Sequence, residues 1–236
     1  MRAAIIAAGE GSRLAKSHAN VVKPLIPVAG KPLIHWVVEG LRSAGCETIT
    51  VLTNSSGGAV ASSLVAAFPS VEFDFVTADT ASSFESFRLV SKRLAETATN
   101  GEFVVSTVDA LIKTEDIARF IAECRASKAA AGLALTKHVD DEKPLWADAD
   151  ANDRVTALGD QAKRKNAVTC GLYYMTRKAA ERLPAADGHS RLRDFWQALV
   201  ASGEVVRGVA LSKSLDVDRP EDLDAAELFL QAESKR

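Results

Sequence analysis

Near the start of the chain, several residue types suited to binding phosphate lie close together. Gly9 and Gly11 are separated by one residue, Ser12 and Arg13 follow them directly, and Lys23 lies further along. Two glycines allow a turn to bring its backbone N–H groups close to an anion without interference from Cβ atoms. A hydroxyl, a guanidinium and a mobile ammonium add donors and positive charge at the same turn. This pattern predicts a loop that holds a polyphosphate.

A second set of residues, three aspartates, has the chemistry to hold a divalent cation. Asp109 follows the apolar run 103–106, and Asp216 and Asp218 lie two positions apart near the end of the chain. Carboxylate oxygens are preferred ligands of Mg²⁺, and residues two apart in an extended segment point the same way. Position alone also allows Asp109 to cap a turn, and Asp218 has capping-box spacing to Glu221. Asp216 has no such local role, so it is the stronger candidate of the pair.

These residues must be positioned by elements that alternate along the first half of the chain. Hydrophobic periodicity predicts strands at 3–7, 48–52, 71–76, 103–106 and 132–136, and helices at 33–41, 60–68, 84–94 and 115–124. Such alternation is typical of an α/β fold with a largely parallel, doubly wound sheet and helices on both faces. Ligands of these sheets bind at the carboxyl ends of the strands, and Gly9, Asp79 and Asp109 each follow a predicted strand.

The second half of the chain has a different rhythm. Strands are predicted at 145–149, 154–158, 168–175 and 205–209, and helices at 192–200 and 220–232. Asn152 and Asp153 predict a hairpin turn between the first two of these strands. No repeat or low-complexity linker separates the halves, so we expect residues 1–236 to form a single domain.

Composition restricts the classes of partner. The 236 residues include 29 Lys and Arg against 31 Asp and Glu, a net charge of −2, which predicts no nucleic-acid or membrane partner. Three cysteines, Cys46, Cys124 and Cys170, lie far apart and predict core thiols in a reducing compartment. No apolar run approaches the roughly 20 residues of a membrane span. We therefore expect a cytoplasmic protein.

The glycine loop matches neither of two common phosphate motifs. Leu14 stands where the dinucleotide fingerprint needs a third glycine, and the Gly-Lys-Ser/Thr of a P-loop is absent. Three longer segments carry a more specific pattern. They are Ala7-Ala8-Gly9-Glu10-Gly11-Ser12-Arg13-Leu14, then Lys23-Pro24-Leu25-Ile26-Pro27-Val28-Ala29-Gly30-Lys31-Pro32-Leu33, and near the end Asp216-Val217-Asp218-Arg219-Pro220-Glu221-Asp222-Leu223. Together these segments resemble the sugar-1-phosphate nucleotidyltransferases, or sugar-nucleotide pyrophosphorylases. The resemblance covers nearly the whole chain and implies a Rossmann-like mixed, mostly parallel sheet flanked by helices.

The resemblance also implies roles for individual residues. It places the nucleotide on Ala7, Ala8, Gly9, Gly11, Ser12, Arg13, Lys23, Asp79, Ser82 and Ser83, with Arg13 and Lys23 as the catalytic cations, Asp109, Asp216 and Asp218 as ligands of Mg²⁺, and Gly171 and Tyr173 at the acceptor. By this resemblance, residues 1–136 form the nucleotide-binding half, and residues 137–236 bind the acceptor and complete the metal site. Ser82 also has capping-box spacing to Glu85, which by itself would explain that serine.

Two departures from the family pattern affect this transfer. Val108 precedes Asp109, where family members often have glycine, so the local backbone shape is open. Thr169 and Cys170 replace the usual residues before Gly171, so a standard hexose contact does not follow.

The reaction implied is transfer of NMP from an NTP to a phosphorylated sugar or small phosphorylated alcohol, with release of pyrophosphate. A molybdopterin guanylyltransferase-like enzyme is an alternative, although its relatives tend to have Gly-Gly where this chain has Ala8-Gly9. A non-catalytic nucleotide-binding regulator on the same fold is another, and pyrophosphate release would separate the two classes. The base, the acceptor and the oligomeric state stay open.

Overall fold

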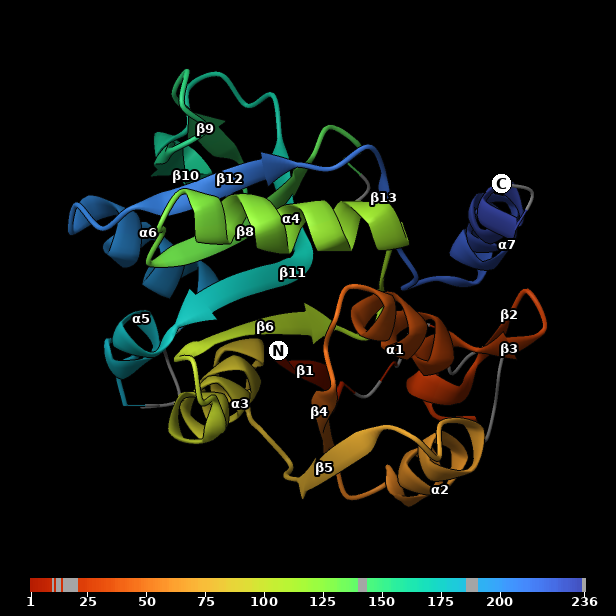
Figure 1. The fold of residues 1–236 in the computed structure, drawn as a ribbon. Coiled ribbons are helices and arrows are strands. Elements are labelled where there is room, and N and C mark those ends of the chain that lie inside the picture. The colour runs from red at the N-terminus through yellow and green to blue at the C-terminus, as the bar shows by residue number, and fades with distance from the viewer. Residues whose placement is uncertain (10, 12–13, 15–20, 140–143, 186–190, 235–236) are drawn as a thin grey trace.

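A seven-stranded sheet in the order β12-β8-β11-β6-β1-β4-β5 runs through the molecule (Figure 1). The computed structural model describes residues 1–9, 11, 14, 21–139, 144–185 and 191–234. The sheet strands are β1 (Arg2–Ala7), β4 (Thr48–Thr53), β5 (Glu72–Thr77), β6 (Glu102–Thr107), β8 (Ala131–Thr136), β11 (Val168–Thr176) and β12 (Val206–Ala210). β11 is antiparallel to β6 and β8, and the other pairings are parallel. The predicted mixed, mostly parallel sheet is confirmed.

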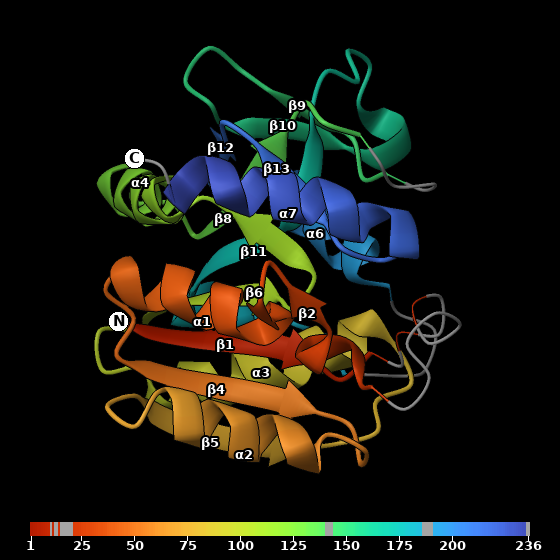
Figure 2. The same ribbon diagram turned by 90° about the vertical axis from the view of Figure 1, so that its right-hand side faces the viewer.

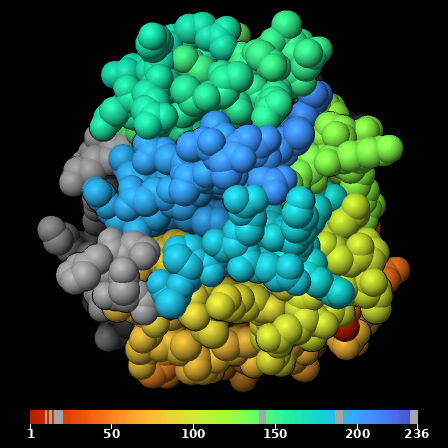
Figure 3. All heavy atoms as spheres, turned by 90° about the vertical axis from the view of Figure 1, so that its left-hand side faces the viewer, coloured from red at the N-terminus to blue at the C-terminus, as the bar shows by residue number. Residues whose placement is uncertain are grey.

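Helices cover both faces of this sheet. They are α1 (Leu33–Ser43), α2 (Gly58–Ala67), α3 (Ser83–Thr97), α4 (Thr114–Ala126), α5 (Arg177–Glu181), α6 (Leu192–Ala201) and α7 (Pro220–Ser234). Side chains alternate across a strand. Ala3 and Ile5 of β1 therefore pack in one core with α1, α2 and α4, and Ala4 packs in a second core with α3, α5 and α6. Figure 3 shows α3, α5 and α6 next to one another on the outer surface.

Several short elements lie outside the main sheet. They are η2 (Lys23–Leu25), the paired strands β2 (Pro27–Val28) and β3 (Lys31–Pro32), the pair β7 (Ala110–Ile112) and β13 (Ser214–Asp216), the hairpin β9 (Ala147–Ala149) and β10 (Val155–Leu158), and η3 (Gly159–Gln161). The hairpin was predicted, and its turn contains Asp153 with a φ of +56°. The β7–β13 ribbon was not predicted, because strands this short carry too little periodicity to be recognised.

The C-terminal helix α7 closes a third, smaller core. Val217, Ala226 and Phe229 pack there against Ile26 and Leu33 from the segment that follows the glycine loop. Figure 2 shows α7 lying across the molecule beside α1 and β13. This contact brings the last part of the chain to the edge of the sheet where β1 ends. Within the described ranges, no helix is both long and apolar enough to cross a membrane.

Candidate active site

Lys23 joins two aspartates that lie far from it in the sequence. Its Nζ donates to Asp109 Oδ2 at 2.7 Å and also contacts Asp218 Oδ1. Lys23 begins η2, Asp109 follows β6, and Asp218 follows β13, so three separate segments meet here. The Lys23 side chain is only 8% exposed, against 28% for Asp109 and 47% for Asp218. The structure thus brings together three of the residues that the sequence analysis singled out.

The charges in this cluster support one another. Burial alone would lower the pKa of Lys23, but the two carboxylates outweigh it and raise that pKa above 10.5. Burial alone would raise the pKa of Asp109, but the ammonium of Lys23 outweighs it and holds that pKa below 3.8. The Lys23 ammonium and the Asp109 carboxylate are therefore both charged at neutral pH.

Asp216 reaches the same place through the β7–β13 ribbon. It pairs with Ala110, the residue after Asp109, and the N–H of Val217 donates to the carbonyl of Asp109 at 3.1 Å. Asp109 and Asp216 both line one pocket of about 350 Å³. These two carboxylates are a donor set that can hold Mg²⁺, if phosphate and water oxygens supply the remaining ligands. Over the described residues, no three His, Cys, Asp or Glu side chains gather as a metal site.

The contacts at the start of α7 differ from the capping role considered for Asp218. Asp222 Oδ2 accepts from the backbone N–H of Asp218 at 2.8 Å and from that of Arg219 at 2.7 Å. The Asp218 side chain instead lies on Lys23. The carboxylate that caps this turn is therefore one position beyond the Glu221 that the capping-box spacing suggested.

The predicted acceptor residues Gly171 and Tyr173 line the same pocket as Asp109 and Asp216. Gly171 has a φ of +55°, and a Cβ placed there would lie 2.4 Å from Thr107 Oγ1. Glycine is therefore required for β11 to pass so close to the end of β6. The Tyr173 ring stacks on the Trp196 ring, with the two centroids 5.3 Å apart. Burial raises the pKa of the Tyr173 hydroxyl, which therefore stays protonated at neutral pH.

Two arginines that the sequence analysis did not single out also line this pocket. Arg191 and Arg193 lie at the start of α6, next to the pocket residue Leu192. The sequence does show basic residues at the start of a predicted helix. It contains no local pattern, however, that indicates which part of the sheet this helix covers. Both arginines place basic side chains at the pocket, where the guanidinium of Arg191 also pairs with Asp194 at 3.3 Å.

The described part of the glycine loop lies against Lys23. Gly11 has a φ of +59°, and a Cβ there would lie 2.7 Å from the Cβ of Lys23. Among the described residues, a Cβ on Gly9 would meet no atom within 4 Å. Ala7 ends β1, and the carbonyl of Ala8 accepts from Asn54 Nδ2 at 3.2 Å. Ser12 and Arg13 fall outside the described residues, so their predicted roles stay predictions.

The residues predicted near the base have different surroundings. Ser82 caps α3, because its Oγ accepts from the N–H of Glu85 at 3.2 Å, while Glu85 Oε2 accepts from the N–H of Ala81 at 2.7 Å. Asp79 Oδ1 accepts from the N–H of Ser55 at 2.9 Å and so links the ends of β4 and β5. Ser83 is the member of this group that lines the pocket containing Asp109.

The protein is similar to curated relatives of one kind. It is 31% identical over 241 residues to the "Bifunctional IPC transferase and DIPP synthase" of Rubrobacter xylanophilus, covering 95% of this chain and 51% of that protein. It is 25% identical to the low-salt glycan biosynthesis nucleotidyltransferase Agl11 of Haloferax volcanii, covering 99% of this chain and 67% of that protein. The chain thus spans about half the length of the Rubrobacter relative.

Solved structures share the fold at low sequence identity. A putative glucose-1-phosphate thymidylyltransferase from Bacillus anthracis superposes with a TM-score of 0.83 and 20% identity, covering 97% of this chain and 94% of the other. The inositol-1-phosphate CTP transferase from T. maritima superposes with a TM-score of 0.79 and 20% identity, covering 98% and 95%.

The family match extends over most of the chain. Residues 3–203 fit the pattern of the MobA-like NTP transferase domain, a range that includes the glycine loop, Lys23 and Asp109. The segment with Asp216 and Asp218 lies just beyond it. From this match and from the sheet and site described above, the chain belongs to the family of MobA-like NTP transferase domains.

Proposed function

We propose that this protein transfers a nucleoside monophosphate from an NTP to a phosphorylated sugar or small phosphorylated alcohol and releases pyrophosphate. The observation that carries the proposal is that Asp109 and Asp216 line one pocket, while Asp109 also accepts from Lys23, whose side chain lies against Gly11 of the glycine loop. A buried lysine against carboxylates, next to a turn that can hold an anion, suits a site for a triphosphate and its metal.

For this reaction, the protein has to position the two substrates and neutralise the charge of their phosphates. In the proposed step, an oxygen of the acceptor phosphate attacks the α-phosphorus, a new P–O bond forms, and the bond to the pyrophosphate oxygen breaks. Little covalent chemistry is required of the side chains. Lys23 moves its ammonium from the carboxylates toward the phosphates, and Arg13 is proposed as a second cation at the same turn.

Magnesium is part of this proposal, with Asp109 and Asp216 as its protein ligands. When bound, it supplies charge neutralisation for the phosphate oxygens and helps to align them. Asp218 shares the ammonium of Lys23 and is proposed to hold that lysine ready. The ammonium of Lys23 can move away from both aspartates when Mg²⁺ binds, because the charge of the metal then neutralises the carboxylates instead.

The pocket supports a compact, anionic acceptor. A volume of about 350 Å³ suits a single phosphorylated ring, and Arg191 and Arg193 in the lining suit its phosphate. The activities for which the similar proteins are named favour two acceptors for the first tests. They are inositol 1-phosphate with CTP, and glucose 1-phosphate with dTTP.

The test is a matrix of CTP, UTP, dTTP and GTP against inositol 1-phosphate, glucose 1-phosphate and phosphocholine, with and without Mg²⁺, with pyrophosphate release as the readout. We expect release that needs both substrates and the metal. Mass spectrometry of the nucleotide-linked product identifies the acceptor. Nucleotide binding with no pyrophosphate release from any pair would show a non-catalytic regulator instead.

We also propose a reducing, cytoplasmic compartment. Cys46, Cys124 and Cys170 are buried and unpaired, and burial raises their thiol pKa values to about 11, 12 and 12. Such thiols behave as core residues and are protected from oxidation.

A further inference from the structure

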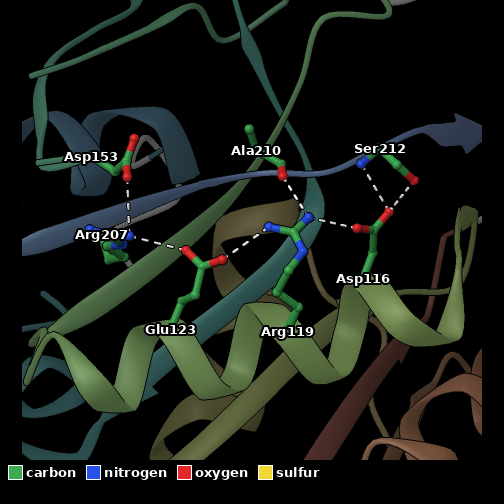
Figure 4. Close-up of polar contacts among 7 residues, drawn as sticks. All are labelled: Asp116, Arg119, Glu123, Asp153, Arg207, Ala210 and Ser212. Carbon is green, nitrogen blue, oxygen red and sulfur yellow. Dashed lines mark hydrogen bonds and ion pairs between the residues drawn. The ribbon is translucent and has the colours of Figure 1, made fainter. Parts of the chain in front are cut away.

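A chain of ion pairs runs between α4 and β12 (Figure 4). Asp116, Arg119 and Glu123 extend from successive turns of this helix toward β12, and the chain continues to Arg207 and Asp153. We call these five residues the α4 ion-pair chain. Its two ends hold different segments of the protein, because Asp153 lies in the β9–β10 turn and Asp116 contacts Ser212.

The Asp116 end makes the densest set of contacts. Asp116 is 3% exposed. Its Oδ2 accepts from the N–H of Ser212 at 2.9 Å and from the Ser212 hydroxyl at 2.5 Å, and its Oδ1 accepts from Arg119 Nη2 at 2.6 Å. Arg119 also donates to the carbonyl of Ala210 at 2.7 Å. Both side chains of α4 therefore hold the short segment that links β12 to β13.

The position of that segment determines where β13, and with it Asp216, lies relative to the pocket. Ser212 lies four positions before Asp216, and the strand β13, which ends at Asp216, has only three residues paired with β7. The other side of the same stretch is held by Asp222, which accepts the N–H groups of Asp218 and Arg219. Two largely buried carboxylates, Asp116 and Asp222, thus hold the strand that carries Asp216 from both of its ends.

We propose that Asp116 is a positioning residue for Asp216: it anchors Ser212 so that β13 places the Asp216 carboxylate beside Asp109. This inference rests on the proposed function, because it assigns Asp216 a working role. Asp116 itself touches neither the pocket lining nor Lys23 in the contacts described. Its effect on the reaction therefore passes through the backbone from Ser212 to Asp216.

The physical reason is the shortness of β13. Three paired residues hold a strand in place weakly unless its ends are fixed. Without Asp116, the backbone bonds of Leu211 to Leu135 and of Val217 to Asp109 remain, so the fold survives. The Ser212 anchor is lost, however, and a shift of about 1 Å in a positioned group can lower a rate by about 100-fold.

The test compares Asp116→Ala with Glu123→Ala, a control on the same helix. Glu123 accepts from Arg119 Nη1 and from Arg207 Nη2, both at 3.0 Å, so its removal breaks the middle of the chain and leaves Asp116 on Ser212. We expect Asp116→Ala to lower kcat by about 10- to 100-fold and to weaken binding of Mn²⁺ in the presence of CTP, measured by electron paramagnetic resonance. KM for the acceptor should change little, and Glu123→Ala should retain the wild-type kcat and Mn²⁺ affinity.

Two further variants separate positioning from stability. Ser212→Ala should show a smaller loss of the same kind, because the N–H bond to Asp116 survives, and Ser212→Thr should recover it by restoring the hydroxyl. Melting temperatures of all variants are measured in parallel. A lower melting temperature with wild-type kcat and Mn²⁺ affinity in Asp116→Ala, or an equal loss of kcat in Glu123→Ala, overturns the inference. A wild-type protein that neither releases pyrophosphate from any of the four nucleotides nor binds Mn²⁺ with CTP removes the proposed function, and the inference with it.

Discussion

The Lys23 cluster and the α4 ion-pair chain use similar charged groups in opposite ways. In the α4 chain, Asp116 accepts three hydrogen bonds and Glu123 accepts two, so each oxygen of these two carboxylates has a protein donor. At the pocket, one ammonium is divided between Asp109 and Asp218. One region therefore uses its charge to fix the backbone, while in the proposed function the other keeps its charge available to a ligand.

The two regions also differ in the type of basic residue, because the α4 ion-pair chain contains arginines and the Lys23 cluster contains a lysine. Arg119 and Arg207 have a planar fork that bonds two or more partners at once and holds separate segments in register. Lys23 has a compact ammonium on a flexible stem, which can move from a carboxylate to a phosphate without rebuilding a rigid network. We expect substitutions to have very different consequences in the two regions.

The largest effect is expected for Asp109→Asn. The change removes the charge that pairs with Lys23 and one of the two proposed Mg²⁺ ligands, so pyrophosphate release should fall by about 10²- to 10³-fold or more. Circular dichroism should show an unchanged fold, because the shape of the side chain is kept. Activity within tenfold of the wild type would exclude Asp109 from the mechanism.

Exchanging the cations of the two regions gives the next largest effect. Lys23→Arg should lower kcat by about 100-fold, because the larger planar guanidinium replaces a buried ammonium that lies between Asp109 and Asp218 and so misplaces the charge. Arg119→Lys should change kcat by less than Lys23→Arg does, since the Asp116–Ser212 bonds remain. Steady-state kinetics of both variants test this, and equal losses would contradict the division between the regions.

Packing around the pocket predicts a smaller effect on stability. Gly171→Ala should lower the free energy of unfolding by about 2–5 kcal/mol: its φ of +55° costs about 1–2 kcal/mol of backbone strain, and its Cβ, 2.4 Å from Thr107 Oγ1 and 2.7 Å from Ala110 Cβ, adds about 1–3 kcal/mol. Gly30→Ala is the matched control, with a φ of +84° and no atom of a described residue within 4 Å of the added Cβ. It should cost about 1–2 kcal/mol from backbone strain alone. Urea unfolding measures both, and a Gly171 cost no greater than the Gly30 cost would show that β11 can shift.

The smallest effect concerns pH. Burial alone would raise the pKa of Asp116, but the hydrogen bonds from Ser212 and Arg119 outweigh it and hold that pKa below 3.8. A lowered pKa in the folded state stabilises the protein above the unfolded-state value, and this stabilisation is lost as pH falls through the folded-state value. Between about pH 5 and pH 2.5, the wild type should therefore lose more stability than Asp116→Asn. Parallel curves from urea unfolding at each pH would contradict the assignment.

The sequence determined the features that depend on local patterns. Short, mostly apolar runs predicted β1 and β4, because a strand that is buried on both faces leaves such a run. A period of about four residues predicted the main helices, because a helix that buries one face leaves such a period in the chain. The Ser82 cap of α3 was predictable for the same reason, since its partner Glu85 is three residues away. The glycine loop could be proposed as a phosphate-binding turn from the sequence, because a turn that cradles an anion is built from consecutive residues.

Only the tertiary structure decided which distant residues meet. The antiparallel place of β11 between β6 and β8, the β7–β13 ribbon that brings Asp216 to Asp109, and the Arg191 and Arg193 lining have no local signature. The same holds for Lys23 on Asp218 and Asp116 on Ser212, which are separated by 195 and 96 positions. Hydrogen bonds and charges act over a few ångströms in space whatever the separation along the chain, so these contacts exist only once the sheet has brought the segments together.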